Sequence, residues 1–117
     1  AAKKLESYSC FVSQNSQIPF IVMPDAINAI TKLMLSDKNK LKNNVYNITS
    51  FSPTVIDFYK EIIKYYKTFK MTYNINIERQ NIINSWPKSL DDSLAIREWG
   101  WKPKYNFKAA FKNYLFL

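Results

Sequence analysis

The pair of residues whose types and spacing match a known catalytic device is Tyr66 and Lys70. Some oxidoreductases use a Tyr-x-x-x-Lys pair, in which the lysine assists a phenol that donates a proton. The chain holds 8 Tyr, and nearly all of its 17 basic residues are Lys, so chance alone is expected to produce such a pair. The pair also falls at the end of an expected helix, with no serine placed beside it by a neighbouring strand. We interpret it as a coincidence and assign no catalytic residue to this chain.

The sequence lacks the residues that familiar cofactor and metal sites require. Gly100 is its one glycine, whereas a dinucleotide-binding fingerprint needs three and a Walker-type loop at least two in one segment. It has no His, which excludes His-based catalytic triads and zinc sites with imidazole ligands. Cys10 is its one cysteine, so neither a thiolate metal site nor an internal disulfide can form. We therefore predict no cofactor-binding and no metal-binding residue here.

Composition also limits the partners. The net charge is +8, but the lysines are scattered among asparagines rather than clustered on one face, so we expect no nucleic-acid partner. No apolar run approaches the roughly 18 residues that a membrane span needs, so we expect no membrane partner. A single cysteine fits a reducing compartment, and we expect an intracellular protein, cytoplasmic or mitochondrial.

Three carboxylates stand where a helix is expected to begin. Asp25 follows Pro24 in a first turn, where the helix dipole favours negative charge. Asp91 and Asp92 stand at the start of another helix, where adjacent residues point in different directions and make a poor acid/base pair. We interpret all three as structural rather than catalytic.

Hydrophobic periodicity predicts a small α/β fold of few short strands and about four helices. Polar turn residues separate the segments. Ser52-Pro53, Ser89/Asp92 and Asn106 are each expected to begin a helix. Gly100 is expected to end the helix that begins near Ser89. The stretch 76–85 reads as polar and irregular. The expected extended segments are 10–12, 20–22, 45–48 and 71–75, and the expected helices are 24–35, 53–66, 90–99 and 107–115.

Several segments resemble one family in order along the chain. Residues 18–27 (Ile-Pro-Phe-Ile-Val-Met-Pro-Asp-Ala-Ile) resemble the Leu-Pro-Met-Met-Tyr-Met-Pro-Asp-Ala stretch of L-threonine 3-dehydrogenases, with Val22 in place of the usual Tyr. Residues 85–93 (Ser-Trp-Pro-Lys-Ser-Leu-Asp-Asp-Ser) resemble their Ser-Trp-Pro-x-Ser-Ile-Asp-Asp-Ser motif. Residues 99–105 (Trp-Gly-Trp-Lys-Pro-Lys-Tyr) are typical of extended short-chain dehydrogenases, epimerases and dehydratases in general.

The resemblance implies that residues 1–117 are the C-terminal, substrate-binding part of a larger NAD-dependent enzyme. The missing N-terminal Rossmann half would bind NAD and supply the catalytic Ser/Thr, Tyr and Lys. The parent enzyme would oxidise L-threonine to 2-amino-3-ketobutyrate and form a homodimer, while this part alone would not be catalytic. The apolar stretch 18–23 and the apolar chain end are expected to pack on that missing part.

The resemblance also implies two substrate-binding residues. In threonine dehydrogenases the Trp of Ser-Trp-Pro lies beside the substrate, which makes Trp86 the first candidate; a core role for its side chain is the alternative. Arg79 lies where sugar-nucleotide epimerases and dehydratases carry Arg-x-Gly-Asp, but Gln80-Asn81-Ile82 departs from that motif. Arg79 would either reach the substrate carboxylate or hold the lobe together.

Two other functions stay open. A parent that is a nucleotide-sugar epimerase or dehydratase shares the general motifs, and the missing Arg-x-Gly-Asp argues against it. A non-catalytic α/β binding module would need no NAD-binding half at all.

Overall fold

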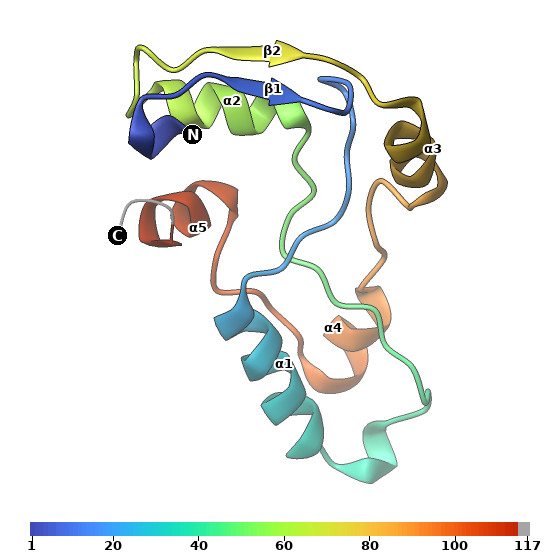
Figure 1. Ribbon diagram of the computed structural model, residues 1–117. Coiled ribbons are helices and arrows are strands. Elements are labelled where there is room, and N and C mark those ends of the chain that lie inside the picture. The colour runs from blue at the N-terminus through green and yellow to red at the C-terminus, as the bar shows by residue number, and fades with distance from the viewer. Residues whose placement is uncertain (115–117) are drawn as a thin grey trace. The chain divides into compact units, whose positions relative to one another are not determined.

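The computed structural model describes residues 1–114 and confirms an α/β protein. Over these residues the chain forms five α-helices and one sheet of two short strands (Figure 1). Two compact units share the chain: unit 1 comprises Ala1–Ile18 and Pro53–Lys88, and unit 2 comprises Pro19–Ser52 and the residues from Ser89 onward. No α-helix within residues 1–114 combines the length and the apolar character that a bilayer crossing requires.

Unit 1 is built around the two strands. β1 (Tyr8–Cys10) pairs in parallel with β2 (Met71–Tyr73), in a register that places Tyr8 opposite Met71. Parallel neighbours need a crossover connection, and α2 (Val55–Ile63) lies in the stretch of chain between them. Cys10, Val12 and Phe69 are buried in this unit.

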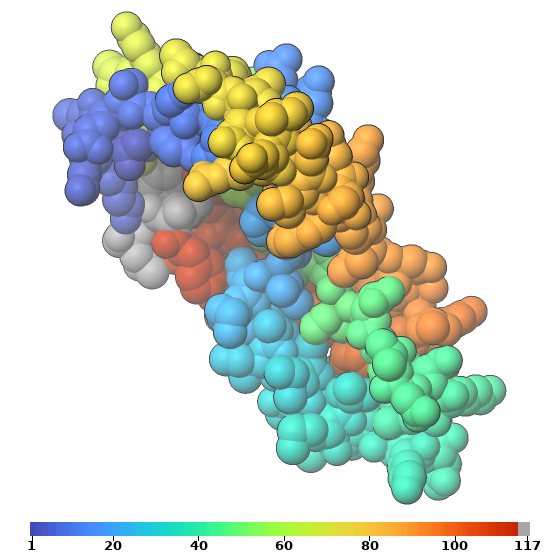
Figure 2. Space-filling view, turned by 45° about the vertical axis from the view of Figure 1, so that its right-hand side comes forward, coloured from blue at the N-terminus to red at the C-terminus, as the bar shows by residue number. Residues whose placement is uncertain are grey.

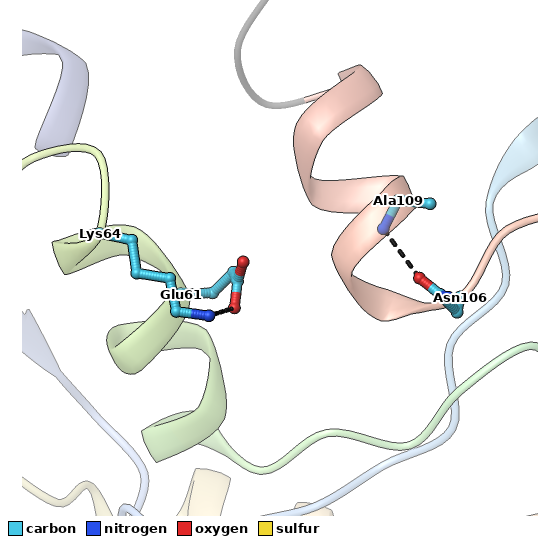
Figure 3. A network of polar contacts seen from close by, with 4 residues as sticks. All are labelled: Glu61, Lys64, Asn106 and Ala109. Carbon is cyan, nitrogen blue, oxygen red and sulfur yellow. Dashed lines mark hydrogen bonds and ion pairs between the residues drawn. The ribbon is translucent and has the colours of Figure 1, made fainter.

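The helix α2 starts two residues later than the sequence predicts. Its N-cap is Thr54, whose Oγ1 accepts a hydrogen bond from the Asp57 N–H, while the Asp57 carboxylate accepts one from the Thr54 N–H. This reciprocal capping box satisfies two backbone donors. The prediction of Ser52 as N-cap and Pro53 as first helical residue was therefore wrong by two residues. Further along the helix, Lys64 pairs with the buried Glu61 (Figure 3).

A helix occupies the stretch predicted to be irregular. α3 (Ile77–Ser85) begins at Asn76, whose side chain accepts from the Arg79 N–H at 3.0 Å. Its apolar residues are spread around the helix, so no stripe marks it in the sequence. The buried polar side chain of Gln80 attaches the helix to the rest of unit 1.

Unit 2 holds a core of aromatic and small residues. α1 (Met23–Met34) and α4 (Ser93–Trp99) supply Ala29, Ala95 and Trp99, and the chain after α4 supplies Trp101, which is 1% exposed. α5 (Phe107–Tyr114) begins as predicted at Asn106, which accepts from the Ala109 N–H at 2.9 Å (Figure 3). Leu115, predicted to continue the apolar face of α5, lies outside the described residues.

The predicted strand at 45–48 is wrong. These residues belong to no helix or strand of the described structure, and Phe20 contributes only an isolated bridge with Phe51. A short apolar segment becomes a strand only where a neighbouring backbone offers hydrogen bonds.

The start of α4 also corrects a prediction, whereas its end confirms one. Asp91 Oδ1 accepts from the Ser93 N–H, while Asp92 caps nothing through its side chain and instead accepts from the Trp101 indole N–H at 3.1 Å. The capping box of Ser89 and Asp92 does not form. Gly100 ends the helix with a φ of 67°, a left-handed conformation that glycine adopts without strain.

A buried carboxylate ties unit 2 together. Asp25 is 0% exposed and accepts hydrogen bonds from the N–H groups of Lys104 at 2.9 Å and Tyr105 at 3.1 Å, and from the Ser50 hydroxyl at 3.3 Å. Its side chain thus joins the first turn of α1 to two segments that are distant in sequence. Asp25 is structural, as predicted from its place in the first turn.

We predict that Asp25→Ala lowers the free energy of unfolding by about 2–6 kcal/mol, because two partly buried N–H groups lose their acceptor at roughly 1–3 kcal/mol each. Asp25→Asn keeps one acceptor oxygen, so its free energy of unfolding should fall by less than that of Asp25→Ala. Glu6→Ala, which removes an exposed carboxylate, is the control. Urea unfolding followed by tryptophan fluorescence measures the difference; equal effects of Asp25→Ala and Glu6→Ala would contradict this role.

A second carboxylate fixes the loop before residue 46. Glu98 of α4 accepts from the Tyr46 hydroxyl, the Lys42 N–H and the Asn43 side-chain amide. The Tyr46 hydroxyl does most to lower the pKa of Glu98; desolvation opposes it, and Lys42 and Asn43 lower the pKa further. The Tyr46 ring meets the Trp99 ring edge-on at 5.9 Å, so this contact connects the loop to the core.

A lowered folded-state pKa means that ionised Glu98 stabilises the fold above its unfolded pKa of about 4.3. That stability is lost as the pH falls through the lower, folded-state value. We predict that stability falls more steeply below about pH 4.3 in the native sequence than in Glu98→Gln. Urea midpoints measured at several pH values test this, and parallel curves for the two proteins would contradict it.

Candidate functional site

Both predicted substrate-binding residues lie at α3 of unit 1. Arg79 stands in the first turn of the helix and Trp86 is the residue that ends it. At 1.5 Å per residue, seven residues place them about 10 Å apart along the helix axis. The structure thus places Arg79 and Trp86 on one short element, which the sequence had described as a loop.

Trp86 presents its ring to the surface. Its N–H donates to the Ile83 carbonyl at 3.1 Å, which turns the chain out of the helix, and Pro87 prevents a further helical turn. The side chain is 52% exposed, whereas Trp99 is 7% and Trp101 1% exposed. An indole left half-exposed at a helix end offers a flat apolar wall to a ligand.

Arg79 is held by an aromatic ring. Its guanidinium carbon lies 4.5 Å from the centre of the Phe11 ring, a cation–π contact with a residue just after β1. A guanidinium placed over a ring keeps its N–H donors available in a fixed plane. The contact joins α3 to the residue that follows β1 and leaves the guanidinium at the surface of unit 1.

The buried amide of Gln80 fixes α3 in place. Its Oε1 accepts from the Ser13 N–H at 2.7 Å, and its Nε2 donates to Ser16 Oγ at 3.0 Å and to Asn84 Oδ1 at 2.8 Å. Both ends of the amide are satisfied, which makes its burial favourable. Arg79, the preceding residue, lies on the helix that this amide anchors.

Sequence reasoning missed three residues of this region. Phe11 and Gln80 act through contacts that cross more than sixty residues of chain, and no local pattern marks such pairs. Ile82, 55% exposed, lies on α3 between Arg79 and Trp86. Together the exposed side chains offer one cation and an apolar surface.

Among residues 1–114 no group of three or more His, Cys, Asp or Glu could hold a metal ion. α2 ends at Ile63, so Tyr66 and Lys70 do not stand on successive turns of one helix. This agrees with the interpretation of the Tyr66 and Lys70 pair as a coincidence.

Three comparisons place the chain among known proteins. An uncharacterized epimerase/dehydratase of Staphylococcus saprophyticus is 41% identical over 106 residues, which are 90% of this chain and 33% of that protein. A GalE-like L-threonine dehydrogenase from Cupriavidus necator superposes with a TM-score of 0.90 at 36% identity, over 97% of this chain and 41% of that one. The L-threonine dehydrogenase from Clostridium difficile superposes with a TM-score of 0.88 at 31% identity, over 96% of this chain and 36% of that one. No protein-family model matches the chain.

The chain thus spans about a third of the length of the curated relatives it matches. It matches the C-terminal part of an extended short-chain dehydrogenase/reductase, the class suggested by residues 99–105. Within that class it superposes on L-threonine dehydrogenases, the group suggested by residues 85–93.

We predict that Trp86 carries most of the tryptophan emission that acrylamide quenches, because the other two indoles are buried. Trp86→Phe should leave a weakly quenched protein, and Trp99→Phe should leave the quenchable component unchanged. Stern–Volmer plots of the three proteins test the exposure of the candidate site. Unaltered quenching in Trp86→Phe would place this indole inside the fold instead.

Proposed function

We propose that residues 1–117 form the substrate-binding lobe of a larger NAD-dependent enzyme that oxidises L-threonine to 2-amino-3-ketobutyrate. The observation that carries the proposal is the pairing on α3 of a half-exposed indole with a guanidinium held over Phe11. The agreement of residues 85–93 with the Ser-Trp-Pro motif and the superposition on threonine dehydrogenases support it. No residue of this lobe is assigned to the proton or hydride transfer itself.

Each residue has a separate task in this proposal. The Trp86 ring covers one side of the small substrate and excludes water from the reacting carbon. Arg79 donates hydrogen bonds to the substrate carboxylate, a pairing for which the guanidinium fork is well shaped. NAD, bound by another part of the enzyme, would accept the hydride from the substrate's hydroxyl-bearing carbon.

A second candidate is a nucleotide-sugar epimerase or dehydratase, since the curated relatives carry that description. A diphosphate needs more cationic and backbone donors than α3 provides. The residue after Arg79 is the buried Gln80, engaged with Ser13, rather than a free loop. These observations favour an amino acid over a sugar nucleotide. A non-catalytic α/β binding module is the third candidate, because an exposed indole such as Trp86 can also contact a ligand that is not chemically changed.

The state of the whole enzyme is part of the proposal. We propose an intracellular homodimer, cytoplasmic or mitochondrial, whose partner is a small-molecule substrate rather than a nucleic acid or a membrane. Light scattering of the full-length protein measures its subunit number.

We predict that the full-length protein produces NADH from L-threonine in a saturable reaction. Trp86→Ala should lower kcat/KM at least about tenfold, equivalent to roughly 1.4 kcal/mol of transition-state binding. Arg79→Gln should raise KM about tenfold or more, because a charged hydrogen bond contributes roughly 1.5–3 kcal/mol.

Glu78→Gln, which changes an exposed neighbour on the same helix, is the matched control and should leave both constants nearly unchanged. Turnover of a UDP- or GDP-sugar without any NADH from threonine would move the enzyme to the epimerase branch. Neither activity in a well-folded protein would favour the binding module.

A further inference from the structure

A cavity with a basic lining lies at the surface of unit 2. Its volume is about 630 Å³, and it is lined by Asn39, Lys40, Lys42, Arg97 and Glu98. The first two belong to a short 3-10 helix, η2 (Lys38–Lys40), and the last two to α4. In Figure 2 the turquoise residues around η2 form part of the visible surface of this unit. A volume of roughly 300–1,000 Å³ is usual for a small-molecule pocket. We call this space the basic cavity.

The lining carries a net charge of +2, from three cations and one carboxylate. The side chains of Lys40, Lys42 and Arg97 are exposed and form no ion pair or hydrogen bond with any of residues 1–114. Arg97 lies more than fifty residues after the two lysines in the sequence, so the fold brings these charges together. Like charges gathered around a concave surface attract anions from solution.

The loop that carries the two lysines is held in place. The Asp37 side chain caps η2 by accepting from the Asn39 N–H at 2.9 Å. Glu98 Oε2 accepts from the Lys42 N–H at 2.8 Å, and Glu98 Oε1 accepts from the Asn43 side-chain amide. Both carboxylate oxygens are thus engaged with the loop, so Glu98 positions the loop instead of neutralising its ammonium groups. A site that is already ordered loses less free energy on binding a ligand.

The charge of the lining matches that of a phosphate group. A phosphomonoester carries about −1.5 to −2 charges at pH 7, close to the +2 of the cavity, whereas a single carboxylate would balance only half of it. The Arg97 guanidinium can donate two parallel hydrogen bonds to phosphate oxygens, and an ammonium group adds a compact charge. The Asn39 side-chain amide hydrogen-bonds to none of residues 1–114, so it is available to a hydroxyl group on the rest of a ligand.

We propose that the basic cavity binds a small molecule through its phosphate group, with Lys40, Lys42 and Arg97 contacting the phosphate oxygens. The cavity belongs to unit 2, whereas Arg79 and Trp86 belong to unit 1. It is therefore a second binding site of this chain, separate from the substrate residues proposed on α3.

Protection of lysines from acylation tests the site in the full-length protein. NAD is added throughout, so that a dinucleotide site elsewhere in the protein is occupied, and glucose 6-phosphate is the probe. At about ten times its Kd, the probe should slow modification of Lys40 and Lys42 by an N-hydroxysuccinimide ester at least about fivefold, by mass action. Lys108 and Lys112, exposed lysines of α5 outside the cavity, should react at an unchanged rate. Peptide mass spectrometry measures each lysine, and unphosphorylated glucose should protect none of them.

Two double variants with the same net charge separate specific contacts from general attraction. Lys40→Gln with Arg97→Gln should weaken glucose 6-phosphate binding at least about tenfold in calorimetry, because two charge-assisted hydrogen bonds are lost. Lys108→Gln with Lys112→Gln is the matched control and should leave the Kd nearly unchanged. Binding to the native protein should also weaken as sodium chloride is raised, since salt screens exposed charges.

Inorganic phosphate distinguishes the two sources of the same anion. Binding as tight as that of glucose 6-phosphate would identify free phosphate as the ligand, and weaker binding would identify a phosphomonoester; the site stands in both cases. No protection of Lys40 and Lys42 by either anion, or equal weakening in the two double variants, would overturn the proposal. None of these measurements uses L-threonine, so the failure of one proposal leaves the other to be judged separately.

Discussion

Unit 2 depends on a single buried carboxylate. Asp25 accepts three hydrogen bonds from groups that lie twenty-five or more residues away, so the start of α1, the chain near Ser50 and the turn at Lys104 and Tyr105 are fixed by one side chain. A buried charge is unfavourable unless its hydrogen bonds are satisfied. The arrangement is specific, because separating these three segments would leave the buried Asp25 side chain without its hydrogen-bond partners.

Unit 1 uses the same principle with an amide. α3 has no apolar stripe to direct its packing, and Gln80 attaches it by accepting from Ser13 and donating to Ser16 and Asn84. A polar anchor of this kind fixes orientation while leaving the outer face of the helix unconstrained. Arg79 and Trp86 thus lie at the surface of a helix whose orientation this amide fixes.

The sequence predictions succeeded where an element is fixed by interactions between residues close in sequence, and failed where the interactions are long-range. The helices at 24–35, 90–99 and 107–115 were predicted because their stripes and their caps at Asn106 and Gly100 are local. α3 was missed because it has no apolar stripe and because its buried amide, Gln80, bonds Ser13 and Ser16, more than sixty residues away. The segment 45–48 was predicted as a strand from its residues, yet no backbone among residues 1–114 pairs with it. Asp92 was predicted as a capping residue but bonds the Trp101 indole, nine residues on.

The sequence by itself determined the class of protein, the absence of a glycine loop and of histidine chemistry, and the two candidate residues Trp86 and Arg79. These conclusions rest on residue identity and order along the chain, which need no coordinates. Only the tertiary structure decided that Trp86 is half-exposed and that Arg79 lies over Phe11. It also decided that no described residue covers Ile27, Ile30 and Met34 of α1, which are more than half exposed. Burial and long-range contact arise from the packing of segments that are far apart in sequence, and no local pattern encodes them.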